Sequence, residues 1–243
     1  MTWEGRFSSP ERKREYVRRL FSTIAPRYDL ITVLLSFGRD RAWKRRLAAL
    51  DDPRGKSVLD LACGTGDIAF ELAQRGARTV VGLDITHLML RLAARKPSLQ
   101  ARRVMFVTAD MMALPFRDGA FDLVTTGYGL RNVPVLERAL SEAARVLRPG
   151  GVLLSLDFNK PTNRFVRGVY LTYLTIVGSV LGAILHRDPD TYRYIPESIR
   201  RYPGSERVRA LTLAAGFARC DVFAVLGGLM TIHRAVRLTT TDD

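Results

Sequence analysis

The chain has 243 residues, 47% of them hydrophobic and 26% charged, which excludes global disorder and suits one domain with a full core, or one domain with a cap. Its formal charge of +14 is uneven, since residues 1–50 hold 12 Lys and Arg against 5 Asp and Glu, and residues 160–209 hold 9 against 4. Such basic segments attract anionic lipid or nucleic acid, although a solvated arginine-rich surface gives the same count.

The first 50 residues are expected to form a helical cap. One face of an amphipathic helix is predicted by the spacing of four apolar residues, Val17, Leu20, Phe21 and Ile24. The preceding residues are charged and lack the apolar core of a secretory signal, and the two cysteines have neither metal-type spacing nor a disulfide framework. We therefore expect a protein of the reducing cytoplasm, with residues 51–243 as its main domain.

The main domain alternates strand-like and helix-like segments. Short apolar runs predict strands at residues 57–62, 79–84, 103–110, 121–127 and 152–158. The segments between them predict helices at residues 67–75, 86–96 and 134–147. Two further strands, 219–226 and 229–236, are joined by Gly227-Gly228, which is a hairpin signal. The pattern indicates an α/β fold with a mostly parallel sheet, helices on both faces and an antiparallel last strand.

Residues 160–205 interrupt this alternation after the fifth strand. Their apolar stretch, Val169–Leu185, is 17 residues long and includes tyrosine, threonine and serine. A membrane-spanning helix needs about 20 predominantly apolar residues, so we expect a buried or interfacial helix in an insert at the ligand-binding edge of the domain.

Val58–Asp67, with the sequence VLDLACGTGD, joins the first strand of the domain to its first helix through a Gly-Thr-Gly turn. Glycines in such a turn let the backbone approach a nucleotide at the carboxyl ends of the strands. Residues 64–69 also match the loose dinucleotide pattern G-x-G-x-x-A, although this match alone is weak and a tight turn without a ligand is an alternative.

Carboxylates on both sides of the turn favour a ligand without phosphate. Asp60 and Asp67 would stand close to the pyrophosphate of a dinucleotide and repel it. S-adenosylmethionine avoids this conflict, because its amino group and sulfonium are positive and its carboxylate can accept hydrogen bonds from backbone N–H groups. An NAD-dependent dehydrogenase is the more distant alternative.

Acidic residues also end the next two strands. Asp84 follows Gly64 by 20 residues, where a carboxylate can bind the ribose hydroxyls of either ligand. Asp110 ends the third strand and can accept a hydrogen bond from the adenine amino group, while Met111 packs the ring; a helix N-cap is the alternative role for Asp110. The combination of these residues at successive strand ends indicates the ligand more specifically than any single residue does. The residues are Asp60, Gly64, Thr65, Gly66, Asp84 and Asp110.

Several stretches outside these motifs carry a family resemblance. They are FSTIAPRYDLITVLLSFGRDRAWKR (21–45), GYGLRNV (127–133), RVLRPGGVLLSLDFNKP (145–161), YRYIPESIRRYP (192–203) and GGLMTIHR (227–234). Together with the turn and the strand-end acids, they make the chain resemble the class I S-adenosylmethionine-dependent methyltransferases. More narrowly, it resembles the demethylmenaquinone / ubiquinone-pathway C-methyltransferase family, over nearly its whole length.

The resemblance implies a Rossmann-like, seven-stranded sheet with a helical N-terminal cap and a substrate-side helical insert. It implies C-methylation of a polyprenylated hydroquinone ring, demethylmenaquinol or a ubiquinone-pathway benzoquinol, with S-adenosylmethionine as the cofactor. Cofactor contacts are implied for Thr65, Asp84, Asp110 and Met111. Family members often have serine just before the aromatic-Gly-Leu-Arg-Asn run, and this chain has Gly127, which leaves only a backbone contact there.

A ring carbon attacks a sulfonium methyl group only when the ring is electron-rich, so we expect the quinol form and a general base or hydrogen-bond acceptor, and no metal. Arg131 follows the fourth strand and is predicted to orient a phenolate or a water, with Asn132 beside it; a surface ion pair is the alternative. His233, on the last strand, is the candidate base, although a lone strand histidine is more often structural. Three tyrosines are expected to line the substrate side or to pack: Tyr28, Tyr192 and Tyr194.

The basic cap and insert flank the strand ends where a lipid quinol would arrive. An apolar insert helix can cover an isoprenoid tail while arginines meet anionic headgroups, which predicts peripheral association with the inner face of the membrane. Two other functions stay open: methylation of another lipid or small molecule, and nucleic-acid binding on a methyltransferase scaffold. The sequence lacks the interleaved aromatic and basic runs of nucleic-acid modules, so no nucleic acid is expected; a homodimer is left open.

Overall fold

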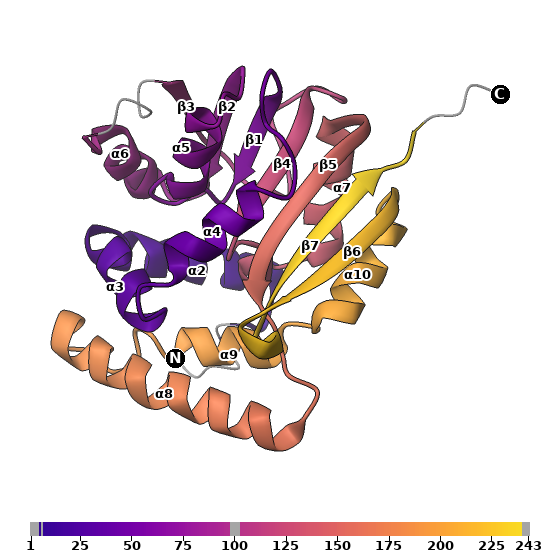
Figure 1. Cartoon of the computed structure of the whole chain (residues 1–243). Coiled ribbons are helices and arrows are strands. Elements are labelled where there is room, and N and C mark those ends of the chain that lie inside the picture. Colours follow the sequence, from indigo (N-terminus) through magenta and orange to yellow (C-terminus); the bar gives the residue numbers. More distant parts are fainter. Residues whose placement is uncertain (1–4, 6, 98–102, 240–243) are drawn as a thin grey trace.

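The computed structural model describes residues 5, 7–97 and 103–239, which form a seven-stranded sheet with helices on both faces (Figure 1). The strands are β1 (Ser57–Leu61), β2 (Thr79–Asp84), β3 (Val104–Thr108), β4 (Phe121–Gly127), β5 (Leu147–Phe158), β6 (Phe217–Val225) and β7 (Met230–Arg237). Their order is β3-β2-β1-β4-β5-β7-β6; β1 to β5 are parallel, and β7 is antiparallel to both of its neighbours. The predicted α/β fold with an antiparallel last strand is confirmed.

Helices cover the two faces of the sheet and the carboxyl ends of its parallel strands. They are α2 (Pro10–Ile24), α3 (Tyr28–Leu35), α4 (Asp40–Ala48), α5 (Asp67–Gln74), α6 (His87–Arg95), α7 (Leu136–Val146), α8 (Arg164–His186), α9 (Tyr194–Arg201) and α10 (Ser205–Ala214), with 3-10 turns η1 (Ala25–Arg27), η3 (Leu130–Asn132) and η4 (Leu226–Gly228). α5 packs Leu72 against one face, and α7 packs Leu140 against the other. Because both faces are covered, neighbouring residues of one strand, Val58 and Leu59, are both buried in separate apolar clusters.

The turn after β1 is built by residues with a left-handed backbone. Ala62, Gly64 and Gly66 have φ angles of 51°, 54° and 86°. The φ angle of Gly66 strains any residue with a Cβ atom, and such an atom would lie 2.8 Å from the Phe70 ring of α5, so the turn favours glycine there. The turn follows β1 at the point where the strand order reverses, between β1 and β4. Open α/β sheets bind their ligands in the crevice that forms at this point.

The N-terminal helices and the insert meet at the carboxyl ends of the parallel strands. In Figure 1, α2 and α3 lie between these strand ends and α8, with α9 close to α8. The Lys13 ammonium of α2 donates to the main-chain oxygen of Val133 at 2.5 Å and so anchors the helix to the loop after β4. The expected cap of residues 1–50 has two parts, because α4 packs Leu47 and Ala48 against the sheet instead of over the strand ends.

α8 packs one face on the domain and exposes the other. A Cβ atom on Gly182, on the buried face, would be 2.5 Å from the Asp188 oxygen, so the helix lies very close to the following loop. Among the described helices, α8 is the only one that alone is long and apolar enough to cross a membrane, with a mean hydropathy of 1.8 over a window that is 22% buried. Large apolar side chains are exposed on its outer face: Phe165, Val166, Val169, Ile176, Val180 and Ile184. A fully buried insert helix, one of the two predictions, is therefore wrong.

Candidate active site

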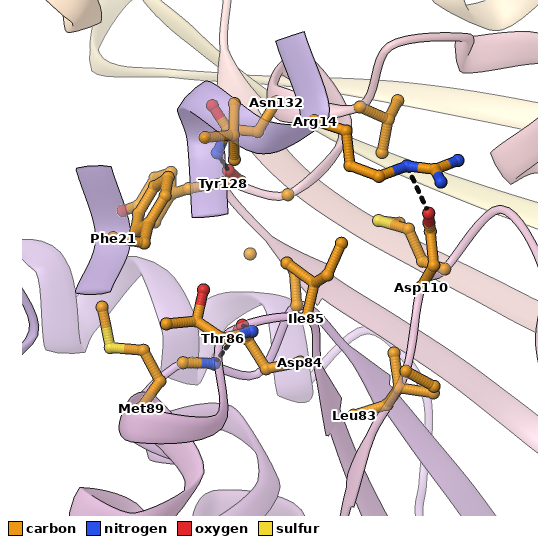
Figure 2. A pocket seen from close by; sticks show the side chains of 18 of the residues that line it. Arg14, Phe21, Leu83, Asp84, Ile85, Thr86, Met89, Asp110, Tyr128 and Asn132 are labelled. Atoms are coloured by element: carbon orange, nitrogen blue, oxygen red, sulfur yellow. Dashed lines mark hydrogen bonds and ion pairs between the residues drawn. The ribbon is translucent and has the colours of Figure 1, made fainter. Parts of the chain in front are cut away.

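A cavity opens at the ends of the central strands, with about 690 Å³ of empty space. We term it the strand-end cavity; α2 covers one side of it (Figure 2). It brings together five predicted cofactor-binding positions that lie at the ends of four different strands or in the loops after them: Gly64, Asp84, Asp110, Met111 and Gly127. Parallel strands present their carboxyl ends at one edge of the sheet, which is why residues far apart in the chain meet here.

Asp84 links the first two strand ends. Its carboxylate accepts hydrogen bonds from the backbone N–H of Gly64 at 2.9 Å and of Thr86 at 2.7 Å. Burial raises the pKa of this carboxyl, although the two N–H donors oppose the shift. The hydroxyl of Thr86 is buried beside it and has no partner among the described residues. Asp84 thus has its orientation set by the backbone and keeps lone pairs for a ligand.

Asp110 is held by two elements. One oxygen accepts from the backbone N–H of Met112 at 2.8 Å, and the other forms an ion pair with Arg14 of α2 at 2.9 Å, drawn as a dashed line in Figure 2. The side chain of Arg14 is 47% exposed, so solvent screens this pair. The predicted adenine acceptor is therefore shared with a residue of the cap.

A smaller cavity of about 290 Å³ adjoins the strand-end cavity and is lined by Asp60, Thr65 and Gly127. Asp60 accepts from the Thr125 hydroxyl at 2.8 Å, and its second oxygen is buried without a partner among the described residues. Burial raises the pKa of Asp60 to about 7. Thr65 donates its hydroxyl to Asp29 at 2.5 Å. Gly66 shapes the turn and lies outside these cavities.

A second, larger cavity, which we term the aromatic cavity, holds about 1490 Å³ of empty space. Its wall includes residues of α2, α3, α4, η3, α8, α9 and η4. Among the lining residues are the three tyrosines expected on the substrate side: Tyr28, Tyr192 and Tyr194. Three residues line both the aromatic and the strand-end cavities: Phe21, Tyr28 and Tyr128. The two cavities therefore share a wall, and a group bound in one can lie close to a group bound in the other.

Arg131 lines the aromatic cavity and is paired with Asp157. Its Nη1 lies 3.0 Å from the Asp157 carboxylate, and its backbone N–H donates to the same group at 3.1 Å. The guanidinium also lies 4.8 Å from the centre of the Phe158 ring. Its Nε–H is buried and has no partner among the described residues. An arginine held in this way keeps one donor for a ligand.

The other two predicted catalytic residues lie in different places. Asn132 lines the strand-end cavity, donates to the main-chain oxygen of Tyr128 at 2.8 Å and accepts from the Tyr194 hydroxyl at 2.9 Å. His233 lies outside both cavities, where its Nε2 is 3.1 Å from the main-chain oxygen of Ser205 at the start of α10. Burial lowers the pKa of His233, which favours a neutral ring that donates this bond.

Comparison with known proteins decides the family. Residues 9–237 match the model of the ubiE/COQ5 methyltransferase family. The chain belongs to this family. It is 45% identical to the demethylmenaquinone methyltransferase of Thermus thermophilus over 82% of this chain and 91% of that protein. It is 41% identical to the ubiquinone/menaquinone biosynthesis C-methyltransferase UbiE of Ectopseudomonas mendocina, over 93% of this chain and 90% of that protein.

Solved structures agree on the fold. An S-adenosylmethionine-dependent methyltransferase of Thermotoga maritima superposes with a TM-score of 0.65 at 18% identity, covering 90% of this chain and 99% of the other. Another, from Aquifex aeolicus, gives 0.58 at 18% identity, covering 82% of this chain and 90% of the other. The predicted enzyme class, a methyltransferase that uses S-adenosylmethionine, is confirmed.

The residues of this methyltransferase fit its cofactor. Asp60 offers an unpaired buried oxygen beside the glycine turn, where a cationic amino group would be stabilised. Asp84 and Thr86 offer oxygen atoms at the end of β2, where ribose hydroxyls can bind. Met111 lies in an apolar wall suited to an adenine ring. The contacts predicted for individual site residues stay predictions.

A network of five charges lies beside the glycine turn. Lys44 of α4 bridges Asp40 at 2.6 Å and Asp67 at 2.9 Å. Lys96 bridges Asp67 and Asp29, each at 2.8 Å. Although burial alone raises the pKa of Asp67, the two ammonium groups bring it down to about 2. The network ties α3, α4 and the end of α6 to the start of α5, next to the wall that the two cavities share.

Sequence reasoning missed three residues of the methyltransferase that contact the cavities: Asp40, Thr86 and Tyr128. A partial signal was present for Asp40, because Lys44 follows it by four residues, the spacing of a helical ion pair. Tyr128 lies between two glycines in the family motif, where only the arginine and asparagine were interpreted. Thr86 had no signal, since a buried hydroxyl without a partner is visible only in three dimensions.

Proposed function

We propose that this methyltransferase methylates a ring carbon of a polyprenylated hydroquinone, with demethylmenaquinol as the acceptor and a ubiquinone-pathway benzoquinol as the second candidate. One observation carries the proposal. The aromatic cavity, with about 1490 Å³ of empty space, shares Phe21, Tyr28 and Tyr128 with the strand-end cavity. An aromatic ring in this cavity lies against the cofactor site, and aliphatic residues such as Ile31 and Leu174 line space for an isoprenoid tail. The names of the relatives support the same acceptors.

S-adenosylmethionine, when bound, supplies a methyl group made electrophilic by its sulfonium. The protein supplies orientation and charge. Phe21, Tyr28 and Tyr128 line the junction where the methyl group and the acceptor ring would meet. Arg131 is oriented by Asp157, and its free Nε–H donates to an oxygen of the acceptor ring. A fixed positive charge in a buried site stabilises developing negative charge on that oxygen.

The test is anaerobic turnover of demethylmenaquinol by the purified protein with S-adenosylmethionine, followed by mass spectrometry of the quinones. Arg131→Lys keeps a charge beside Asp157 but loses the guanidinium donors, so kcat should fall about 100-fold while cofactor affinity is retained. Arg148→Lys is the matched control, because Arg148 lies at the opposite end of the sheet, where its 57% exposed side chain pairs with Asp122. Methylation of another lipid or small molecule, with demethylmenaquinol untouched, would contradict the proposal and support the second function.

The proposed location is the cytoplasm, at the inner face of the membrane. The acceptor is a membrane lipid, and the aromatic cavity is bordered by Phe37, which is 76% exposed and stacks 6.1 Å from Tyr173 of α8. The exposed apolar face of α8 continues from this border. Arg164 and Arg167 stand in the first turn of α8 and Arg187 follows its end, where anionic headgroups would meet them.

Liposome flotation tests this surface. The wild type should float with vesicles that contain anionic lipid and should be released by high salt. Ile176→Glu, on the exposed face of α8, should abolish flotation. Met105→Glu is the matched control, because Met105 is 57% exposed on β3 and Ile176 is 59% exposed. Flotation that does not depend on the anionic lipid content, or that is retained in Ile176→Glu, would contradict the proposed peripheral membrane contact.

A further inference from the structure

The aromatic cavity contains a hydrogen-bonded pair of titratable side chains, Tyr128 and Asp40. The Tyr128 hydroxyl donates to the Asp40 carboxylate at 2.8 Å, and both side chains line the cavity. Tyr128 is 7% exposed and Asp40 3% exposed. Asp40 is also the only carboxylate among the described residues that line this cavity. A quinol acceptor must lose a proton for its ring carbon to become strongly nucleophilic, so a carboxylate in this position calls for an explanation.

The backbone of Tyr128 is held in a conformation that a tyrosine rarely adopts. Its φ angle is 62°, in the left-handed region. Three hydrogen bonds hold it there: its N–H donates to Leu156 at 2.7 Å, and its carbonyl accepts from Arg131 at 2.9 Å and from Asn132 at 2.8 Å. A strained backbone of this kind persists only where several surrounding contacts fix it, and such residues are concentrated at functional sites. Here it directs the Tyr128 ring to the wall between the two cavities.

The direction of the hydrogen bond defines what Tyr128 can do. Because its proton is given to Asp40, its oxygen keeps lone pairs that can accept a proton from a third group. Burial, together with the nearby Asp40 charge, raises the pKa of Tyr128 well above its usual range, so the group is a neutral hydroxyl before the acceptor binds. A neutral hydroxyl backed by a carboxylate can pass a proton on in a single exchange.

The charges around Asp40 leave room for one more proton. Three carboxylates, Asp29, Asp40 and Asp67, face two ammonium groups, Lys44 and Lys96. The network therefore carries one net negative charge when all five groups are ionised. A proton added to Asp40 makes it neutral, and Lys44 keeps Asp67 as a partner. Accepting a proton here leaves no buried cation unpaired.

We propose that Tyr128 accepts the hydroxyl proton of the acceptor quinol and passes its own proton to Asp40. The O–H bond of the quinol breaks, a new O–H bond forms on Tyr128 as its old one breaks, and Asp40 becomes a carboxylic acid. The electron pair of the broken bond stays on the ring oxygen beside Arg131 and makes the ring carbon nucleophilic. After methylation, Asp40 and Tyr128 return the proton to the same oxygen while the ring carbon releases its hydrogen as a proton to water.

This inference rests on the proposed quinol acceptor, so the experiment separates the two. With wild type shown to methylate demethylmenaquinol, Tyr128→Phe and Asp40→Asn should each lower kcat about 100-fold. KM for the quinol and the calorimetric Kd for S-adenosylmethionine should stay within about threefold, since transition-state interactions are lost and ground-state binding is retained. Asp40→Glu, which restores a carboxylate, should recover part of kcat. Matched controls outside both cavities are Tyr202→Phe, at a buried position, and Asp51→Asn, at a partly buried one.

The pH profile gives a readout that a merely structural role would not change. In Tyr128→Phe, kcat should rise towards about pH 10, where a phenolic acceptor ionises without help, and the deficit against wild type should shrink. The charged and titratable groups that face Tyr128 and Asp40 are Tyr28, Lys44, Asp67 and Arg131, and none of them is changed by this variant.

Several results would overturn the relay. Tyr128→Phe with near-normal kcat and an unchanged pH profile would do so, and so would a loss of kcat accompanied by an equal loss of cofactor binding, which marks a structural role. A wild type that does not methylate any quinol removes the inference together with the proposed function, whereas active wild type with active Tyr128→Phe removes the relay alone.

Discussion

The two cavities share a wall but are built differently. The strand-end cavity is organised by the sheet: Asp84 and Asp110 are oriented by backbone N–H groups in the loops after β1, β2 and β3. The aromatic cavity is organised mainly by helices, and its lining residues are far apart in the chain, from Leu20 of α2 to Met230 at the start of β7. Its few polar groups are oriented by one another, as Arg131 is by Asp157. The cofactor half of this enzyme therefore depends on the fold, and the acceptor half depends on specific side-chain pairs.

The largest effect is expected where the aromatic cavity depends on a buried ion pair. Arg131→Ala leaves Asp157 buried and unpaired, which should cost about 3–5 kcal/mol in the free energy of unfolding, measured with urea. Arg131→Ala combined with Asp157→Ala should cost less than the sum of the two single variants. Arg148→Ala breaks a pair whose arginine side chain is 57% exposed, so solvent screens it and the loss should be about 1 kcal/mol or less. Equal losses for Arg131 and Arg148 would contradict the contrast between a buried pair and a solvent-screened one.

Substitutions in the strand-end cavity should weaken the binding of S-adenosylmethionine. In Asp84→Asn, one carboxylate oxygen becomes an NH₂ group that faces a backbone N–H donor, so about 1–3 kcal/mol is lost and the calorimetric Kd for S-adenosylmethionine should rise at least tenfold. Asp122→Asn is the control: Asp122 accepts from Ser57 N–H at the opposite end of the sheet. If both variants bind the cofactor equally well, Asp84 has no specific part in the site.

Acid should weaken the charge network at the junction of the cavities. The pKa of Asp67, about 2, lies below that of an unfolded aspartate, so its contribution is full at neutral pH and is lost as the pH falls from about 4 towards 2. With allowance for solvent screening, the contribution is about 1–2 kcal/mol. Asp67→Asn should therefore lower stability at pH 7 and have almost no effect near pH 2. An equal loss at both pH values would contradict this assignment.

The smallest effect is expected at the contact between the cap and the cofactor site. Arg14→Ala removes a half-exposed partner from Asp110, so the oxygen is free for adenine and affinity for S-adenosylmethionine should rise about two- to threefold. Arg19→Ala, which breaks an exposed pair with Glu15 on the same helix, should leave the affinity unchanged. A large fall in affinity for Arg14→Ala would mean that Arg14 binds the cofactor itself.

The same contrast explains what could be predicted from the sequence. The strand ends were predictable because a run of apolar residues followed by glycine or aspartate marks them locally, and parallel strands then bring Gly64, Asp84 and Asp110 together. The pair of Asp40 and Tyr128 was not predictable, because it joins residues 88 positions apart through the docking of α4 against the loop after β4. The position of His233 was not predictable either, although its strand was. The register of β7 directs this side chain towards α10 and away from both cavities.

The position of α2 has a consequence for how the two ligands exchange. Phe21 of this helix belongs to both cavity walls, and Lys13 anchors the same helix to the main chain at Arg131 and Val133. A displacement of α2 that admits the nucleoside therefore also changes the space available to the ring. A ligand bound in one cavity therefore changes the affinity of the other cavity for its own ligand. By thermodynamic linkage, the change is the same factor in both directions.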